Sequence, residues 1–246
     1  MGSKLQTPNS KLQLIWNLVI GNWKLRRGFG LFELMVVITI IGITISVITA
    51  SFLTFEKNQR LKNAANAMKN EIRLAQSKAL SGDKGPLNTA GENPCSNDSA
   101  DGETLIGWYM NIDTAITNDP YQHFYTIKGD CSDPSEPAGW RIFGEKTIQL
   151  PKNVNVNKFI YGSTDLSEQA VNILYQPLTH NVLFFYAHGG PPLTPPFLSS
   201  GQIDESKLIG ASMIQSPLTI ELKNIQDNRT YNVIIQPSGE VNEVKP

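Results

Sequence analysis

The sequence predicts an α+β protein in which one long N-terminal α-helix packs on a C-terminal antiparallel β body, a sheet or a sandwich. The first observation is an apolar run at 34–55, whose 22 residues include no charged residue and no proline. The second is a following stretch, 56–81, with apolar side chains at helical spacing. The third is the remainder of the chain, where short β-branched and aromatic runs alternate with clusters of Asn, Asp, Gly and Pro. A helical period followed by such runs is typical of this class.

Charge is distributed unevenly along the 246 residues, whose net charge is −1. Residues 1–28 contain five bases and no acid, and residues 56–84 contain seven bases and three acids. Residues 85–246 contain nine bases and eighteen acids. The chain therefore has a basic head, an apolar run, a basic stalk and an acidic body.

The apolar run is long enough to cross a bilayer, which takes about 20 helical residues. It is apolar on every face, whereas the core helix of a soluble protein has one apolar stripe. It is also longer than the apolar part of a cleaved secretory signal, roughly 7–15 residues. The bases at 1–28 orient the N-terminus towards the cytoplasm. We therefore expect a single-pass protein of the cytoplasmic membrane with everything after Phe55 outside the cytoplasm.

The stalk is expected to continue the same helix, because nothing between Phe55 and Leu61 breaks it. Its apolar positions are three or four residues apart, with bases on the other face. These positions are Leu61, Ala64 or Ala65, Met68, Ile72, Ala75 and Ala79. The sequence SGDKGP at 81–86, with two glycines and a proline, predicts the end of the helix.

The body is expected to be all β, with strands over 104–112, 122–128, 140–150, 154–161, 170–175, 182–188, 218–222 and 230–236. The stretch 189–202 is rich in Pro and Gly and predicts a long surface loop. Cys95 and Cys131 both fall in the external part, where an even pair is a candidate disulfide. Two unpaired thiols are the alternative.

One carboxylate, Glu33, directly precedes the apolar run. A charged residue in a membrane segment is costly and indicates function by default. The sequence GFGLFEL at 28–34 resembles the signal of type IV prepilins and type II secretion pseudopilins, except for Gly30, where Thr or Ser is usual. The resemblance implies that a prepilin peptidase cuts between Gly28 and Phe29 and N-methylates the new amine of Phe29. The expected divisions are then a leader at 1–28, a transmembrane and assembly helix at 29–55, an amphipathic stalk at 56–81 and an extracytoplasmic β domain at 82–246.

The resemblance also implies an ion-pair partner for Glu33. It lies one helical turn beyond the new positive N-terminus, and it can pair with the α-amine of a neighbouring subunit. Such a pair sets the register between subunits, because breaking it leaves a buried charge uncompensated, at about 3–5 kcal/mol. The alternative is a carboxylate at a helix end that reaches towards water.

A finer resemblance is to the GspH/FimT class of minor pilins and pseudopilins, on the stalk sequence AANAMKNEIRLAQSKAL at 64–80 and the ending RTYNVIIQPSGEV. It implies two packed β sheets against the C-terminal half of the helix and a last strand pair closing around Gly239. Many major pilins have a proline where this chain has Ala50, which favours a minor or pseudopilin role.

Catalytic and metal-binding patterns are not found in the sequence. His123, His180 and His188 are too scattered for a metal motif, and no cofactor site is expected. Residues 97–102 faintly resemble a calcium loop, but Trp108 stands where a bidentate Glu is needed. No Ser/His/Asp grouping or phosphate loop is present, so no enzymatic activity is expected. The acidic body argues against DNA binding, which requires bases that neutralise phosphates.

The functional hypothesis is a structural subunit, of the minor class, of a type IV pilus or a type II secretion pseudopilus. Its expected partners are prepilin peptidase, other pilin or pseudopilin subunits, the inner-membrane assembly platform and membrane lipid. After extraction it would lie in an extracytoplasmic filament, in the periplasm or at the cell surface. The chief alternative is an uncleaved, membrane-anchored β domain that acts as a binding or sensor module. A surface hydrolase is a third, and it lacks a catalytic constellation.

Overall fold

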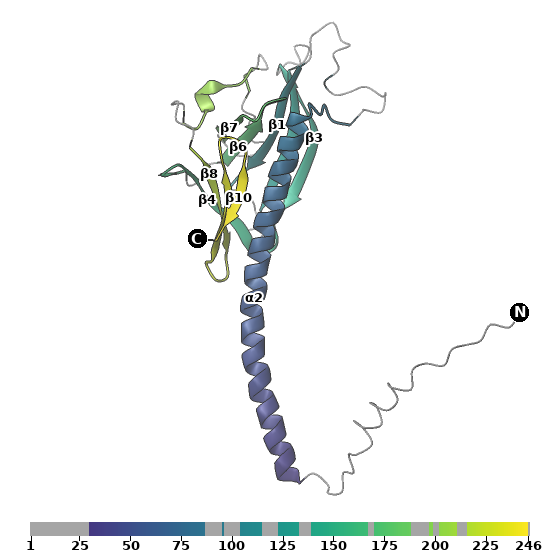
Figure 1. Ribbon diagram of the computed structural model, residues 1–246, viewed down its shortest axis with the longest axis vertical. Helices are drawn as coiled ribbons and strands as arrows, with labels where there is room; N and C mark the ends of the chain where they lie inside the picture. Colours follow the sequence, from purple (N-terminus) through teal and green to yellow (C-terminus); the bar gives the residue numbers. More distant parts are fainter. Residues whose placement is uncertain are drawn as a thin grey trace, which may run out of the picture. The chain divides into compact units, whose positions relative to one another are not determined.

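The structure is a computed structural model and describes residues 30–86, 95, 104–114, 123–132, 139–166, 170–187, 197–198, 202–210 and 216–245 (Figure 1). It confirms the α+β class: a long N-terminal helix is followed by two antiparallel β-sheets. The chain divides into two units, residues 1–53 and residues 54–246.

The helix, α2, runs without a break from Leu31 to Leu80, so the apolar run and the stalk form one element as predicted. Its end is capped through the backbone. Gly82 has a φ of +64°, its N–H donates to the carbonyl of Ala79 at 3.0 Å, and the N–H of Asp83 donates to Lys78 at 2.9 Å. This pair of bonds is the Schellman arrangement, in which glycine takes the left-handed conformation at low cost. The turn in SGDKGP therefore ends the helix where the sequence predicts.

The described strands form two five-stranded sheets in which every neighbouring pair is antiparallel. The first has the order β3 (Trp140–Gln149), β2 (Phe124–Ser132), β1 (Thr104–Ile112), β6 (Ala170–Tyr175) and β7 (Val182–Ala187). The second has the order β10 (Val241–Val244), β9 (Thr230–Ile235), β8 (Leu218–Asn224), β4 (Val154–Tyr161) and β5 (Thr164–Asp165). A short 3-10 helix, η1, spans Glu205–Lys207.

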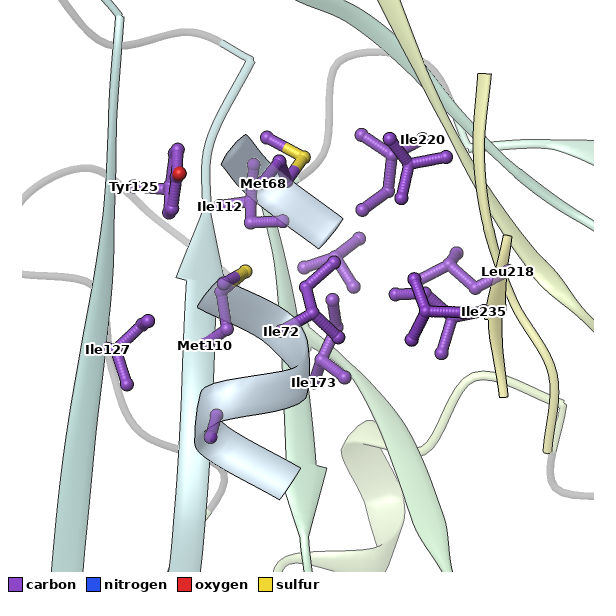
Figure 2. Packing of buried hydrophobic residues seen from close by; sticks show 14 of the residues in the cluster. Met68, Ile72, Met110, Ile112, Tyr125, Ile127, Ile173, Leu218, Ile220 and Ile235 are labelled. Atoms are coloured by element: carbon purple, nitrogen blue, oxygen red, sulfur yellow. The ribbon is translucent and has the colours of Figure 1, made fainter. Parts of the chain in front are cut away.

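The C-terminal half of α2 supplies the centre of the main core. Its buried side chains are Leu61, Ala64, Ala65, Met68, Ile72, Ala75 and Ala79, which is the face predicted from the spacing. Figure 2 shows Met68 and Ile72 between residues of the two sheets, with Met110 and Ile112 of β1 nearby and Ile220 of β8 across the core. Four alanines on this face let the helix backbone approach the strands closely. Both sheets and the helix therefore share one hydrophobic core.

A second, smaller core lies on the other face of the first sheet. In the stretch 189–202, which is predicted to be a long surface loop and is described only at 197–198 and 202, Phe197 is buried. It packs edge-on against Tyr109 of β1, with ring centroids 5.9 Å apart. Leu174 and Phe185, on β6 and β7, belong to the same cluster. The first sheet thus has an apolar outer face, and burying it accounts for the position of Phe197.

Candidate functional site

The N-terminus of α2 holds the first candidate residue. The first backbone bond of the helix runs from the N–H of Leu34 to the carbonyl of Gly30, at 3.1 Å. Glu33 lies in the first turn and is exposed. A carboxylate there is stabilised by the partial positive charge of the helix N-terminus. Gly28 and Phe29, the predicted cleavage and methylation site, lie outside the described residues.

The surface of residues 31–49 is apolar and exposed all around the helix. Ile38, Ile43 and Val47, for example, are 59%, 63% and 67% exposed. Among the described residues, α2 is the helix with the length and composition to cross a membrane. A surface this large and apolar is not kept in water, so it is covered by lipid or by other helices.

The hydroxyl groups within this apolar surface bond to their own helix. Thr39 donates to the carbonyl of Met35 at 2.7 Å, and Thr44 donates to that of Ile40 at the same distance. Ser46 and Thr49 each donate to the carbonyl four residues earlier, at 2.8 Å. These bonds satisfy donors that would otherwise be costly in a medium without water. The segment is therefore suited to an apolar environment in its polar groups as well.

Polar contacts tie the stalk half of α2 to the sheets. Lys69 forms an ion pair with Glu243 of β10, and this hydrogen bond lowers the pKa of Glu243. Arg73 Nη2 donates to the carbonyl of Val241, at the start of β10, at 3.2 Å. The last strand is thus bound to the helix as well as to β9.

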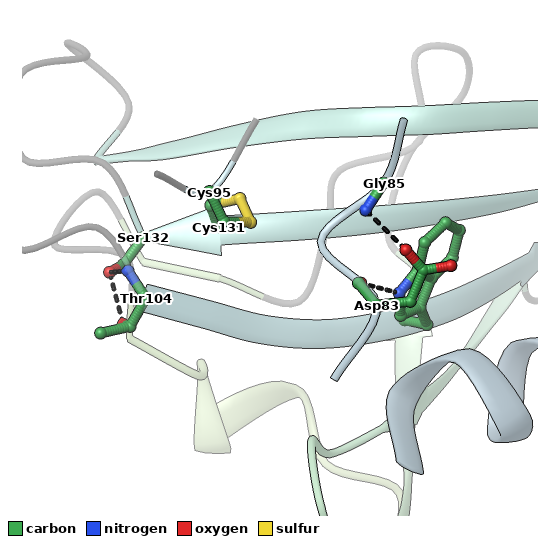
Figure 3. The surroundings of a disulfide bond; sticks show 7 residues. Asp83, Gly85, Cys95, Thr104, Cys131 and Ser132 are labelled. Atoms are coloured by element: carbon green, nitrogen blue, oxygen red, sulfur yellow. Dashed lines mark hydrogen bonds between the residues drawn. A yellow bond between two sulfur atoms is a disulfide. The ribbon is translucent and has the colours of Figure 1, made fainter. Parts of the chain in front are cut away.

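The turn after α2 is fixed to the first sheet (Figure 3). Trp108 Nε1 donates to the carbonyl of Asp83 at 2.7 Å, and the Gly85 N–H donates to its carboxylate at 2.8 Å. Lys78 Nζ lies 2.7 Å from the same carboxylate and 4.2 Å from the centre of the Trp108 ring. Burial alone would raise the pKa of Asp83, but the bonds from Lys78 and Gly85 outweigh it and lower the pKa. The helix end is thereby locked onto β1.

Cys95 and Cys131 are joined by a disulfide in the structure, with their Cα atoms 5.7 Å apart (Figure 3). Both residues are fully buried, and Cys131 belongs to β2. The bond links the segment after the helix to an interior strand of the first sheet, since β2 lies between β1 and β3.

Asp130 is a buried carboxyl group that the sequence did not single out. It precedes Cys131 on β2, is 0% exposed, and is aligned with Gly107 on β1. Burial raises its pKa to about 8, although the backbone N–H groups of Cys131 and Arg141 and the ammonium of Lys128 favour the charged form. Neither carboxyl oxygen reaches hydrogen-bond geometry with a described residue. Asp130 is therefore protonated at neutral pH.

The histidines do not gather in the structure. His123 is buried, which lowers its pKa against the opposing effect of Asp113, and His180 is exposed. Across the part of the chain that the structure describes, no three His, Cys, Asp or Glu side chains are placed to hold a metal ion. His188 and the calcium-like residues 97–102 lie outside that part.

Comparison with known proteins identifies one feature. A family model described as the prokaryotic N-terminal methylation motif matches residues 23–49. The match covers Gly28, Phe29 and Glu33 together with most of the apolar run. No curated protein and no solved structure matches the chain. The motif supports a type IV pilin-like protein that is a substrate of prepilin peptidase and assembles with other pilin subunits. Together with the apolar helix, it fits a membrane-anchored protein with an extracytoplasmic domain.

Proposed function

We propose that this chain is the precursor of a minor structural subunit of a type IV pilus or a type II secretion pseudopilus. The observation that carries the proposal is the sequence GFGLFEL, which continues into a helix whose apolar surface is exposed on every side. Prepilin peptidase removes residues 1–28 and N-methylates Phe29. A lone membrane anchor has no need for a glycine before the run or for a carboxylate five residues later.

Assembly then uses the surface of residues 29–55. In the membrane this surface is covered by lipid, and in a filament it is covered by the same segment of other subunits. Glu33 pairs with the methylated amine of Phe29 on a neighbouring subunit. Because an unpaired charge in this setting is costly, only registers that form the pair are stable. The stalk, 56–81, carries the β domain, 82–246, on the outside of the filament.

The minor class is supported by two features of the fold. The C-terminal half of α2 packs against two antiparallel sheets, as the resemblance to the GspH/FimT class implies. The last strand pair, β9 and β10, closes at Gly239, whose φ is +84°. The remaining partners are the inner-membrane assembly platform and membrane lipid, with the N-terminus in the cytoplasm. The filament lies in the periplasm or at the cell surface.

A processing assay tests the proposal. The full chain is coexpressed with an active or an inactivated prepilin peptidase, and the product is sized by mass spectrometry. We expect loss of 28 residues only with the active enzyme. Gly28→Leu should abolish cleavage, because the peptidase requires a small residue before the cut. Gly30→Ser is the matched control, since a Cβ at Gly30 meets nothing within 4 Å and the change restores the usual residue. Normal cleavage of the Gly28 variant would refute the assignment.

A further inference from the structure

A groove begins where the apolar run ends. It lies within residues 54–246, encloses about 220 Å³ and is formed by α2, β9 and the last residues of the chain. The side chains that matter for its chemistry are Phe55, Leu61, Lys62, Arg229, Tyr231 and Lys245. Apolar and basic groups thus line one small site.

The charge of the groove is opposite to that of the body around it. Lys62, Arg229 and Lys245 are among its lining residues, and none of the lining residues is acidic. Residues 85–246 as a whole have twice as many acids as bases. Arg229 is oriented by Asn58, which accepts from its Nη1 at 2.5 Å, and by Asp227, 3.5 Å from its Nε. Lys62 and Lys245 are both exposed, and neither forms an ion pair with another described residue.

The position of the groove along the helix matches the depth of a phospholipid headgroup. Phe55 is both the last residue of the apolar run and a wall of the groove. Lys62 is seven residues further on, a rise of about 10 Å along α2. The headgroup layer occupies roughly 5–8 Å beyond the hydrocarbon core on each side. The long Lys62 side chain tilts towards the helix N-terminus, so its ammonium reaches back into this layer. Tyrosine side chains such as that of Tyr231 are favoured at this boundary.

We propose that this groove binds the headgroup of an anionic phospholipid in the leaflet from which the β body emerges. The inference rests on the proposed placement of residues 34–55 in the membrane. Lys62, Arg229 and Lys245 contact the phosphate, while Phe55 and Tyr231 pack against the glycerol and the first acyl carbons. An acidic patch on another subunit would match the charge, but it would leave the apolar wall uncovered. The bound lipid seats the β body on the membrane before assembly.

Lipid retention by the full chain provides the test. The chain, purified from cells with an active prepilin peptidase, is placed in nanodiscs of equimolar phosphatidylglycerol and phosphatidylcholine. Native mass spectrometry then gives the ratio of the two lipids that stay bound to the chain after it is released from the nanodisc. We expect the wild-type chain to retain phosphatidylglycerol preferentially. The double variant K62Q/K245Q should reduce that preference tenfold or more, since each base near an anionic surface contributes about 1 kcal/mol.

Two variants serve as controls. K62R/K245R keeps both charges and should retain the preference. K158Q/K207Q removes two lysines that form ion pairs elsewhere on the body and should also retain it. Any basic residues at 1–28 are the same in every variant, so differences between variants report the groove alone. A wild-type ratio in K62Q/K245Q, or no preference in the wild type, would overturn the inference.

The same spectra separate this inference from the proposed function. The mass of the chain reports whether residues 1–28 have been removed. A cleaved chain without a lipid preference would contradict lipid binding by the groove and would remain consistent with the proposed role as a filament subunit. An uncleaved chain whose lipid preference depends on Lys62 and Lys245 would support lipid binding by the groove and would contradict the proposed role as a filament subunit. Cross-links from Lys62 to an acidic residue of another subunit, with no lipid preference, would make that subunit the occupant instead.

Discussion

Glu33 is the residue whose role depends most on its surroundings. In the single chain it is exposed in the first turn of α2, where the helix N-terminus stabilises its charge. Packed among apolar helices, the same carboxylate requires a cation. The methylated amine of Phe29 is the nearest one that the proposed processing provides, because it is created four residues before Glu33.

Replacing Glu33 should therefore separate processing from assembly. We expect Glu33→Ala to be cleaved normally but to enter filaments at less than about a tenth of the wild-type level, since the amine of its neighbour loses its partner. Sheared filaments and membranes are compared by immunoblot. Thr39→Val is the control, because the Thr39 hydroxyl donates to the carbonyl of Met35, within its own helix, at 2.7 Å. Wild-type incorporation of Glu33→Ala would remove the pairing role.

Asp130 predicts an unusual dependence of stability on pH. Its folded pKa is about 8, against 3.8 for an unperturbed group, so between these values the folded chain holds a proton that the unfolded chain releases. The free energy of unfolding should fall as pH rises through this window, by at most about 1.4 kcal/mol per unit, and level off above pH 8. Asp130→Asn should be less sensitive to pH and more stable than the wild type at pH 8.

Urea titrations of the full chain in detergent at pH 5, 6.5 and 8 would measure this effect. Asp204→Asn is the control. Its pKa is lowered, chiefly by a hydrogen bond from Ser206, so it stays ionised throughout this range. A slope that persists unchanged in Asp130→Asn would show that another group is responsible.

At the scale of elements, the stalk face of α2 organises the body. Ile72 is 0% exposed and lies between the two sheets (Figure 2). Leu74, on the same helix, is 40% exposed. Truncating Ile72 leaves a cavity bordered by strands of both sheets. Truncating Leu74 shortens a side chain at the surface and leaves no internal cavity.

This difference gives a matched pair of variants. Ile72→Ala should lower the free energy of unfolding by about 2–5 kcal/mol, and Leu74→Ala by about 0.5 kcal/mol or less. Chemical denaturation of the full chain, followed by Trp fluorescence, gives both values. Equal losses would mean that the helix does not form part of the core.

The elements with a strong pattern were predictable from the sequence. The helical face was read from spacing alone, and β1, β4 and β6 have the predicted bounds. The strand β2 begins two residues later than predicted and extends to Ser132, and η1 was not expected. The strand β5 was missed, because two residues are too short for a period to be recognised. The four residues of β10 show no period either, and this strand was expected only from the resemblance, which implies a last strand pair closing around Gly239. Strand β10 is stabilised by pairing with β9 and by the ion pair of Glu243 with Lys69, which is remote from it in sequence.

Site residues are likewise predictable only where a local sequence pattern marks them. The sequence predicted Glu33, Cys95 and Cys131 because each stands out locally. Burial of Asp130 depends on how the outer face of the first sheet is covered, and no local pattern reports it. The groove brings residues 55–62 together with residues 229–231 and Lys245 through the pairing of β8, β9 and β10. Its bases are unremarkable until the fold places them side by side.

At the scale of the whole molecule, the disulfide links the segment that follows the helix to the first sheet. Cys95 and Cys131 are 36 residues apart, and closing a loop of this length stabilises the folded state by roughly 3–4 kcal/mol on the chain-entropy account. Cys95→Ser with Cys131→Ser should lower the melting temperature by about 10 °C for a body of this size.

A reductant should lower the wild-type melting temperature by a similar amount and leave the double variant unchanged. Differential scanning fluorimetry with and without dithiothreitol measures both shifts. If the wild type melts at the same temperature under both conditions, and a thiol reagent labels its cysteines under both, the cysteines are not oxidised in the purified chain.

The central claim is that the chain is cut at Gly28 and built into a filament. Intact mass and N-terminal sequencing of the protein recovered from the sheared filament fraction of its own host test it most directly. The account predicts a chain of 218 residues, 28 fewer than the 246 of the precursor, that begins with N-methylated Phe29. A chain that stays in the membrane fraction with Arg26, Arg27 and Gly28 attached, in cells that process other prepilins, would contradict it and identify a permanent membrane anchor.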